Sequence, residues 1–460
     1  MKTVVNIKDF GALSNGELQT KAIQAAIDHV FLSGGGEVQI PGEVYMTGGI
    51  RIRSNVTLHL LAGAVLKGSQ NPEDYYDSYK KDNVEPLSSD RITDAPYVHL
   101  KTIQGEVCYN ASDERYNFRR LPGSRWNNAL IRAIDAENVA IIGEKDSVID
   151  GNNCFDAIGE ENFRGPHAIT FFNVKNIILE GYSVRDSANW AHNMIFCENI
   201  SMRWVKVFAG HDGFDVFSSN NITITDCKFY TGDDCVAGFG NTNVLVSNCI
   251  MNSACSALRF GGTNVLVQNC NMFSPSKYSF RGKMPLEDKI ACKPSPTHGR
   301  NMLSVFTYYA DYSMPISEIP GNIVIKDCIF TNVQRFMHYN FSGNETWQRY
   351  RPMNDISFEN IKASNVSMGI NAYGTEKYPL ELRLKNVDIS MHEEASLTEL
   401  IKAAHCNRIV FENVTIEHFR GDCIVRARTD GEYVFNNVKS EVEEKHFVKK
   451  TDEEFDIRRI

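Results

Sequence analysis

The sequence predicts an all-β protein folded as a parallel β-helix, and a short repeated phrase carries the prediction. The phrase begins at five positions that lie 23, 22, 22 and 21 residues apart: Ile177, Ile200, Ile222, Val244 and Val265. Each copy alternates apolar with polar residues, as a half-buried strand does, and each follows an asparagine. Because equivalent strands of neighbouring coils stack about 4.8 Å apart, coils of about 21–23 residues with several short strands each form a solenoid.

Looser copies of the phrase extend the solenoid toward the C-terminus, and they begin at Ile323, Ile356, Leu382, Ile409 and Tyr433. We expect the asparagines before the strands to stack as a turn ladder, with their side chains bonding local backbone. Leucine-rich and helical repeats share this period. The leucine signature is missing, however, and the phrases hold too many β-branched residues for helices.

The remaining segments are interpreted relative to a single β-helix domain over residues 1–460. An amphipathic helix within residues 18–33 buries Ile23, Ala26, Ile27 and Val30, ends at three glycines, and is expected to cap the N-terminal coil. Residues 71–127 and 274–321 interrupt the repeat and are expected to be insertions that shape a binding face. The charged residues 439–460 are expected to form a C-terminal cap or tail.

Composition narrows the class of protein. A net charge of −9 argues against a nucleic-acid binder. Four of the twelve cysteines (Cys227, Cys249, Cys270 and Cys328) occupy the same place after a strand, so we expect stacked free thiols, which suit a reducing compartment. The cysteines and histidines lack zinc-site spacing, and we expect neither a metal nor another cofactor. No apolar signal core or membrane span is evident, which predicts a cytoplasmic protein; its oligomeric state is left open.

The residues that point to chemistry are three aspartates in consecutive coils. Asp212 precedes Asp233 by 21 residues and Asp234 by 22, close to one period, so the three are expected to lie near each other on one wall. Clustered carboxylates repel each other and raise at least one pKa. This arrangement supplies one protonated and one ionised carboxyl group at the same pH, which is the requirement of glycoside hydrolysis.

The alternative is that these aspartates only form turns, as Asp-Gly pairs often do. The match between the coil register and the spacing of the three favours catalysis. We expect Gly213 and Gly232 to let a bulky ligand approach the backbone. Asp215, which lies in the next β run, is a weaker candidate.

Several motifs between Val5 and about Phe330 together resemble glycoside hydrolase family 28, the polygalacturonases and their relatives. They are Asp9-Phe-Gly-Ala with Asn15-Gly, Thr20-Lys-Ala-Ile-Gln-Ala-Ala-Ile, Gly34-Gly-Gly, Ile141-Ile-Gly with Asp150-Gly, His211-Asp-Gly and Thr231-Gly-Asp-Asp-Cys. The family's motifs corresponding to the last two are Asn-Thr-Asp-Gly and Gly-Asp-Asp-Cys. The resemblance implies a right-handed parallel β-helix and an inverting hydrolase.

Residue roles follow from the resemblance. Asp233 would be the general acid, and Asp212 and Asp234 would hold and deprotonate the attacking water. The family grips the substrate carboxylate with an Arg-x-Lys pair, for which Arg281-Gly282-Lys283 is the best match. An arginine and a lysine beside an insertion are also often simply solvated.

One departure makes the chain a divergent member. The family's Gly-His-Gly should fall near Ala254-Cys255-Ser256, where no histidine occurs. His211 or Arg259 is a candidate for part of that space and for substrate binding, and each is equally open to a structural reading. Trp190 and His192 lie about one coil before Asp212 and are further candidates for the flank of the site.

Three functions remain in competition. The first is an inverting hydrolase of galacturonate-containing pectic oligosaccharides, exo-acting because a cytoplasmic address and two insertions suit short chains. The second is a glycosidase for rhamnogalacturonan or another glycan that is not polygalacturonate, since the histidine is absent. The third is a β-helix that binds glycan without cleaving it.

Overall fold

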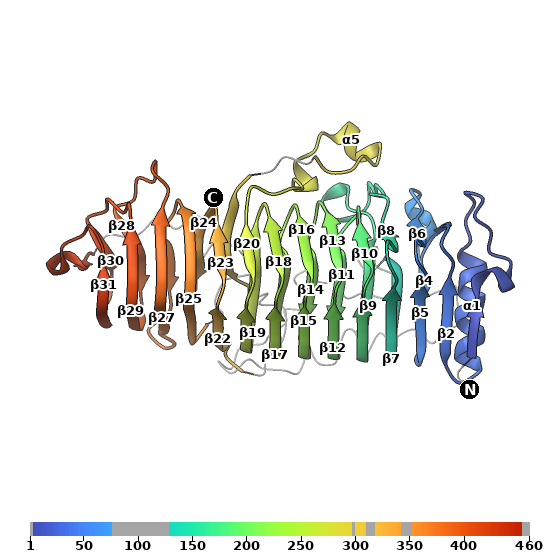
Figure 1. Cartoon of the computed structure of the whole chain (residues 1–460), viewed down its shortest axis with the longest axis horizontal. Helices are drawn as coiled ribbons and strands as arrows, with labels where there is room; N and C mark the ends of the chain where they lie inside the picture. The colour runs from blue at the N-terminus through green and yellow to red at the C-terminus, as the bar shows by residue number, and fades with distance from the viewer. Residues whose placement is uncertain (1–2, 76–127, 297–299, 310–317, 342–351, 453–460) are drawn as a thin grey trace.

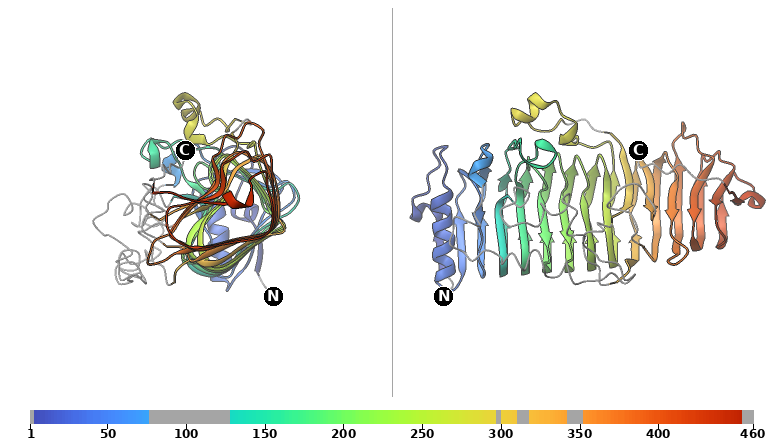
Figure 2. Two further views of the ribbon diagram at one scale, coloured as in Figure 1. Left: turned by 90° about the vertical axis from the view of Figure 1, so that its left-hand side faces the viewer. Right: turned by 180° about the vertical axis from the view of Figure 1, so that it is seen from behind.

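The computed structural model describes residues 3–75, 128–296, 300–309, 318–341 and 352–452. It is a solenoid of stacked parallel strands, in which the coils follow one another along a single long axis (Figures 1 and 2). Every strand pairs with the equivalent strand of the next coil, and the pairings form three columns. The expected parallel β-helix is therefore present, and the described part of the chain is nearly all β.

The three columns are defined by the pairings. The first contains β1 (Thr3–Asn6), β2 (Gly36–Ile40), β5 (Val56–Leu60), β12 (Glu198–Arg203), β15 (Asn220–Thr225), β22 (Gly321–Lys326) and β31 (Glu432–Lys439). The second contains β3 (Val44–Thr47), β6 (Val65–Gly68), β8 (Val148–Asp150), β10 (Ser183–Arg185), β13 (Lys206–Ala209), β16 (Lys228–Thr231), β18 (Ile250–Ser253), β20 (Asn271–Phe273) and β23 (Ile329–Thr331).

The third column contains β4 (Ile50–Arg51), β11 (His192–Ile195), β14 (Phe214–Phe217), β21 (Met302–Tyr308), β24 (Val333–Asn340), β26 (Ile370–Tyr373), β28 (Glu399–Ala404), β30 (Cys423–Ala427) and β32 (Val448–Lys450). Some strands run through a corner from the third column into the first: β7 (Ala129–Gly143), β9 (His167–Glu180), β17 (Val236–Ser247) and β19 (Ser256–Gln268). Others run from the first into the second: β25 (Asp355–Val366), β27 (Leu380–Met391) and β29 (Cys406–Glu417).

The repeated phrase sets the register of the first column, as predicted. Ile200 pairs with Ile177 before it and with Ile222 after it, and the pairing continues through every predicted phrase start to Tyr433. Alternate residues point into a shared apolar interior, as in β15, where Ile222 and Ile224 are buried between half-exposed threonines. Each such buried side chain contributes about 1.5–3 kcal/mol relative to exposure, so the register with the apolar face inward is strongly preferred.

The asparagine ladder is present, but its bonding differs from the expectation. Asn199 donates from its side-chain amide to that of Asn176, and Asn221 donates in the same way to Asn199. These asparagines have positive φ angles, which asparagine tolerates better than most residues. Their side chains therefore join neighbouring coils to each other instead of closing a turn on local backbone.

The cysteine stack is confirmed. The thiols of Cys227, Cys249, Cys270 and Cys328 contact one another in order inside the solenoid, and all four are buried. The interaction with the Cys249 thiol, together with burial, raises the pKa of Cys270 to about 12, so it is a neutral thiol at physiological pH. In the described part of the chain all cysteines are free.

A helix, α1 (Thr20–Leu32), lies at the N-terminal end of the solenoid beside β2 (Figure 1). Its buried residues are the four that the sequence predicts: Ile23, Ala26, Ile27 and Val30. It ends where Gly34 and Gly35 take positive φ angles, a conformation that glycine adopts without steric cost. Among the described residues no helix is long and apolar enough to span a membrane.

The two expected insertions have different outcomes. Most of 71–127 lies outside the described residues, apart from the short helix η2 (Pro72–Tyr75) at its start. Within 274–321 the chain first leaves the solenoid through η5 (Arg281–Lys283) and α5 (Leu286–Ile290), which project beyond the coils (Figure 1). It then forms β21, in which Phe306 pairs with Leu258 of β19. The external segment is therefore shorter than predicted, and residues 274–296 are called the outer loop below.

The C-terminal residues 439–460 are partly described. They contain the short helix η6 (Glu444–His446) and the strand β32, which pairs with β30. Residues 453–460 of the expected cap or tail lie outside the described residues.

Candidate active site

Three stacked turns join the second column to the third and carry the candidate residues. They lie between β13 and β14, between β16 and β17, and between β18 and β19. Gly213 donates its backbone N–H to the carbonyl of Asp234, and Cys235 donates in the same way to Ser256, so the turns stack like the strands. Asp212, Asp234 and Ser256 occupy equivalent places, one coil apart.

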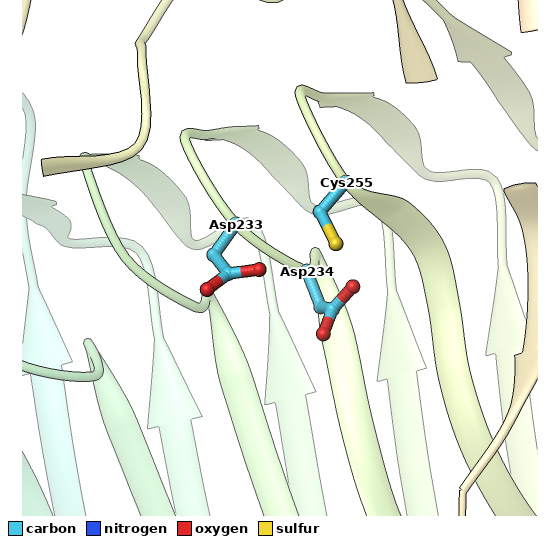
Figure 3. A group of neighbouring side chains, drawn as sticks. All are labelled: Asp233, Asp234 and Cys255. Atoms are coloured by element: carbon cyan, nitrogen blue, oxygen red, sulfur yellow. The ribbon is translucent and has the colours of Figure 1, made fainter. Parts of the chain in front are cut away.

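The structure brings the predicted aspartates together. The backbone N–H of Asp234 donates to Oδ1 of Asp212 across 3.2 Å. One carboxylate oxygen each of Asp233 and Asp234, together with Sγ of Cys255, lie within 4.8 Å of one another, and the three side chains come from adjacent turns (Figure 3). Asp212 and Asp234 are buried whereas Asp233 is partly exposed, so Asp233 is the carboxyl group that a ligand reaches first.

Asp234 is held by two donors. Its Oδ1 accepts the backbone N–H of Ser256 at 3.0 Å, and its Oδ2 forms an ion pair with Nη1 of Arg259 at 3.2 Å. The guanidinium of Arg259 lies over the ring of Tyr309, 4.7 Å from its centroid. A fully buried carboxylate needs such partners because desolvation penalises its charged form.

Asp212 has a second acidic neighbour, Asp215, and the two carboxyl groups act electrostatically on each other. Burial, followed by the nearby carboxylates, raises the pKa of both groups well above the usual range. Two buried carboxyl groups that act on each other in this way resist being ionised together, so their protonation is linked. Asp215 is therefore part of the cluster, although its sequence position made it a weaker candidate than the other three.

His211 stands one coil before Asp233, inside an aromatic cage. Its ring stacks on Phe163, with centroids 5.8 Å apart, and meets Phe280 edge-on at 5.7 Å. The imidazole is fully buried, and its two ring nitrogens have no hydrogen-bond partner among the described residues. Burial, aided by Arg164 and Arg281, lowers its pKa well below the usual value, so the ring is neutral.

Trp190 and His192 are buried in the coil that precedes Asp212. Trp190 packs against His167 and Phe217. His192 contacts the carbonyl of Gly213 through Nδ1 at 2.9 Å and the hydroxyl of Tyr182 through Nε2 at 3.0 Å. Both ring nitrogens are thus occupied, and His192 positions the backbone next to Asp212; its predicted contact with substrate stays a prediction.

The predicted carboxylate grip, Arg281 and Lys283, lies in the outer loop. The buried guanidinium of Arg281 donates to the side chain and the backbone carbonyl of Asn153, at 2.9 and 2.6 Å. Its backbone N–H donates to Gly210, next to the catalytic turn. Arg281 thereby fastens the outer loop to the solenoid, and the side chain of Lys283 is exposed. Among the described residues, neither Arg281 nor Lys283 forms an ion pair with the three aspartates.

Gly213 and Gly232, in the stacked turns, differ from the expectation that they admit a ligand. A side chain on Gly232 would meet the backbone of Ser279 in the outer loop, and a side chain on Gly213 would meet the carbonyl of Cys235 and the ring of Phe229. These glycines make room for the protein's own chain. The expectation that they admit a ligand to the backbone was wrong.

Two arginines near the cluster were missed by the sequence analysis. Arg164 is buried, pairs with Glu161 at 3.1 Å, and acts electrostatically on both Asp212 and Asp233. Arg300, which follows the outer loop, is exposed and donates Nε to the carbonyl of Ala254 at 3.0 Å. Neither lies at a fixed offset in the repeat, so the coil period gave no signal for them.

The same cluster offers a donor set for a cation, since two carboxylates and a thiol lie close together. The guanidinium of Arg259 already supplies a positive charge to Asp234. The contacts therefore favour a carboxylate cluster neutralised by protein groups and protons over a metal centre.

The part of the chain that contains the aspartate cluster is similar to known proteins. Residues 102–256 match the model of the glycosyl hydrolases family 28. An exo-poly-alpha-D-galacturonosidase of Dickeya chrysanthemi is 28% identical over 240 residues, which span 48% of this chain and 39% of that protein. The match thus covers well under two thirds of the relative's length.

Solved structures share the fold. A hyperthermoactive exopolygalacturonase from Thermotoga maritima has a TM-score of 0.63 at 19% identity, with 91% of this chain and 93% of that chain covered. A family 28 exopolygalacturonase from Yersinia enterocolitica has a TM-score of 0.54 at 19% identity, with 96% and 79% covered. The region that contains the three aspartates thus resembles glycosyl hydrolases family 28, and the solved structures share the fold of the chain.

Proposed function

We propose that the protein is a glycoside hydrolase that cleaves galacturonate-containing pectic oligosaccharides from a chain end. The observation that carries the proposal is the cluster of Asp212, Asp233 and Asp234 on stacked turns, with one partly exposed and two buried carboxyl groups. The substrate class draws support from the Dickeya chrysanthemi relative, whose name states exo-action on galacturonan.

The proposed mechanism divides the work by exposure and contacts. Asp233, the accessible carboxyl group, donates its proton to the glycosidic oxygen as the bond from carbon to the leaving oxygen breaks. A water held by Asp234 and Asp212 attacks the anomeric carbon and gives up a proton to this pair. The products are two sugar hydroxyl ends, and the protons rebalance through solvent.

The stereochemical course needs its own test. Carboxyl groups of inverting enzymes are typically about 6.5–9.5 Å apart, and those of retaining enzymes about 5–5.5 Å. Asp233 and Asp234 have oxygens within 4.8 Å, which by itself does not favour inversion. Both oxygens of Asp234 are engaged, by Ser256 and Arg259, which disfavours this carboxylate as a covalent nucleophile and supports a water-mediated, inverting course.

The carboxylate of a galacturonate substrate needs an accessible cation near the aspartates. The guanidinium of Arg281 donates to Asn153, whereas Arg300 is exposed and donates to the carbonyl of Ala254, the residue before Cys255. We therefore favour Arg300 as the described residue that recognises a galacturonate carboxylate, through charge-assisted hydrogen bonds.

The outer loop supports exo-action. It lies against two of the catalytic turns: Arg281 donates to Gly210, and Gly232 packs against Ser279. A wall built on these turns limits how far a glycan extends past Asp233. An endo-acting enzyme would instead need a cleft that is open at both ends.

A second candidate is a glycosidase for rhamnogalacturonan or another glycan that is not polygalacturonate. The observation behind it is Cys255, which stacks on Asp233 where a histidine is expected. A non-catalytic glycan binder is the third. We further propose that α1 closes the N-terminal end of the solenoid, and that the buried free thiols suit a reducing, cytoplasmic address.

Product analysis separates these functions. The wild-type chain is incubated with defined galacturonate oligomers, rhamnogalacturonan oligomers and neutral oligosaccharides, and products are resolved by anion-exchange chromatography over time. Release of one small product from galacturonate oligomers supports the first proposal. A ladder of mid-chain fragments excludes exo-action, cleavage of rhamnogalacturonan alone supports the second candidate, and binding without cleavage supports the third.

A further inference from the structure

We propose that Arg259 is the positioning residue that makes Asp234 the catalytic base, a role that rests on the proposed hydrolase function. Arg259 was first a candidate for substrate binding. Its contacts assign it instead to the carboxylate cluster, where it orients Asp234 and compensates its charge.

The first line of support is the ion pair itself. Nη1 of Arg259 lies 3.2 Å from Oδ2 of Asp234, and the side chain of Asp234 is fully buried. Asp234 is faced by Asp212 and Asp215 from the preceding coil, by Asp233 beside it and by Cys255 from the following coil. All these side chains are acidic or neutral, so the guanidinium of Arg259 supplies the positive charge beside Asp234, and the Ser256 N–H donates to its other oxygen.

The second line of support is orientation. Ser256 and Arg259 each hold one oxygen of Asp234, and the backbone N–H of Asp234 holds Asp212. The rotation of the Asp234 carboxylate is therefore fixed relative to Asp212. A base must be held in this way to present a lone pair to water in a reactive geometry.

The third line of support is the environment of Arg259. Its side chain is only 18% exposed, and its guanidinium lies against the face of Tyr309. In the third column Arg259 follows Asp215 by two coils, through Ala237. The strand register therefore places the guanidinium of Arg259 next to the carboxylate cluster.

The same column provides a matched control. Arg426 on β30 occupies the equivalent row, through Thr307, His338, Asn371 and Lys402. It pairs with Glu399 at 2.6 Å, and its side chain is also 18% exposed. Substituting Arg426 removes a comparable ion pair several coils from the aspartates.

The experiment compares Arg259→Gln, Arg259→Lys and Arg426→Gln with the wild-type chain, measuring kcat and KM separately on the oligosaccharide that the wild type cleaves. We expect Arg259→Gln to lower kcat about 10²–10³-fold, as loss of a preorganised electrostatic partner does, with KM changed less than about 3-fold. Arg259→Lys should recover part of kcat, and Arg426→Gln should leave both constants near wild type. Added guanidinium should also restore part of the activity of Arg259→Ala.

The outcomes distinguish the two proposals. A wild-type chain without turnover overturns the proposed function and this inference with it. An active wild type whose Arg259→Gln variant keeps its kcat, or raises only KM, overturns the positioning role alone. If Arg259→Gln fails to fold, the Lys variant and the guanidinium rescue decide: a folded Lys variant with lowered kcat supports the role, and unchanged kcat contradicts it.

Discussion

The backbone N–H of Asp234 donates to Oδ1 of Asp212, so one aspartate of the cluster holds the side chain of another across the coil boundary. The stacking that builds the fold also sets this contact, because Gly213 bonds the carbonyl of Asp234 in the same pair of turns. A change that shifts the coil register would therefore alter the geometry of the cluster. The geometry of the cluster thus depends on how the coils stack.

Asp215→Asn is predicted to stabilise the protein near neutral pH. Burial and neighbouring carboxylates raise the pKa of Asp215 and Asp212 in the folded chain. A raised folded pKa means that the folded state binds more protons, so stability is highest below the unfolded pKa of about 3.9 and falls as pH rises. Asparagine removes one charge and keeps a donor for Asp212.

Thermal melting from pH 4 to pH 8 tests this. The variant should melt higher than wild type at pH 8, by about 2–4 °C or less for each 1 kcal/mol relieved, and the difference should vanish toward pH 4. Asp226→Asn, in an exposed turn where Asp226 bonds Asn248, is the matched control and should show no pH-dependent difference. A constant or negative difference across this range would argue against a raised pKa of Asp215 in the folded chain.

Arg300→Gln is predicted to weaken substrate binding, and Arg281→Gln is predicted to lower stability. Arg300 is exposed beside Ala254, so its loss should raise KM for galacturonate oligomers about 10-fold or more while leaving thermal stability unchanged. Arg281 is buried and bonds Asn153, so its loss should lower the melting temperature. Steady-state kinetics on acidic and methyl-esterified oligomers, with melting curves, separates the two. An Arg300 effect of equal size on both substrates would exclude carboxylate recognition.

Cys249→Ser is predicted to destabilise the solenoid more than Cys292→Ser. The Cys249 thiol is buried between those of Cys227 and Cys270, whereas Cys292 is partly exposed at the end of α5. Placing a hydroxyl in the apolar stack costs about 1–3 kcal/mol if it lacks a good partner. Urea unfolding measures the difference, and equal midpoints for the two variants would contradict a structural role for the stack.

Inversion is predicted at the anomeric carbon. Proton NMR during the first minutes of hydrolysis reports the configuration of the newly formed reducing end before it equilibrates. An α-linked substrate should first give the β anomer. Initial appearance of the α anomer would indicate retention and would turn attention to Asp212 or Asp234 as a covalent nucleophile.

Much of the fold was predictable because a repeat turns local pattern into tertiary register. Ile200 and Ile222 occupy the same place in consecutive phrases, and they pair in the structure. The aspartates followed for the same reason, since their spacing matches the coil. The asparagine side chains were assigned to local backbone because one coil considered alone offers no other partner; stacking supplies Asn176 to Asn199.

The contacts that the sequence did not predict involve residues outside the repeated phrase. Arg281 matched the family's motif for binding the substrate carboxylate, but its guanidinium donates to Asn153 in the structure. The outer loop makes this contact with a distant segment, so the coil period does not predict it. Arg300 and Arg164 reach the site from irregular segments. The nearness of Asp215 to the other carboxyl groups was also not predicted, because the alternation along a strand does not show which side chains of neighbouring turns it meets.

The role of Asp233 as general acid is tested most directly by the turnover of Asp233→Asn on the oligosaccharide that the wild type cleaves. The substitution keeps the shape of the side chain and removes the proton that the leaving oxygen needs, and general acids contribute about 10²–10⁴-fold. We predict a kcat lower by at least about 10²-fold with an unchanged melting temperature, and near wild-type kcat for the exposed control Asp226→Asn. Turnover by Asp233→Asn at the wild-type rate would contradict the account.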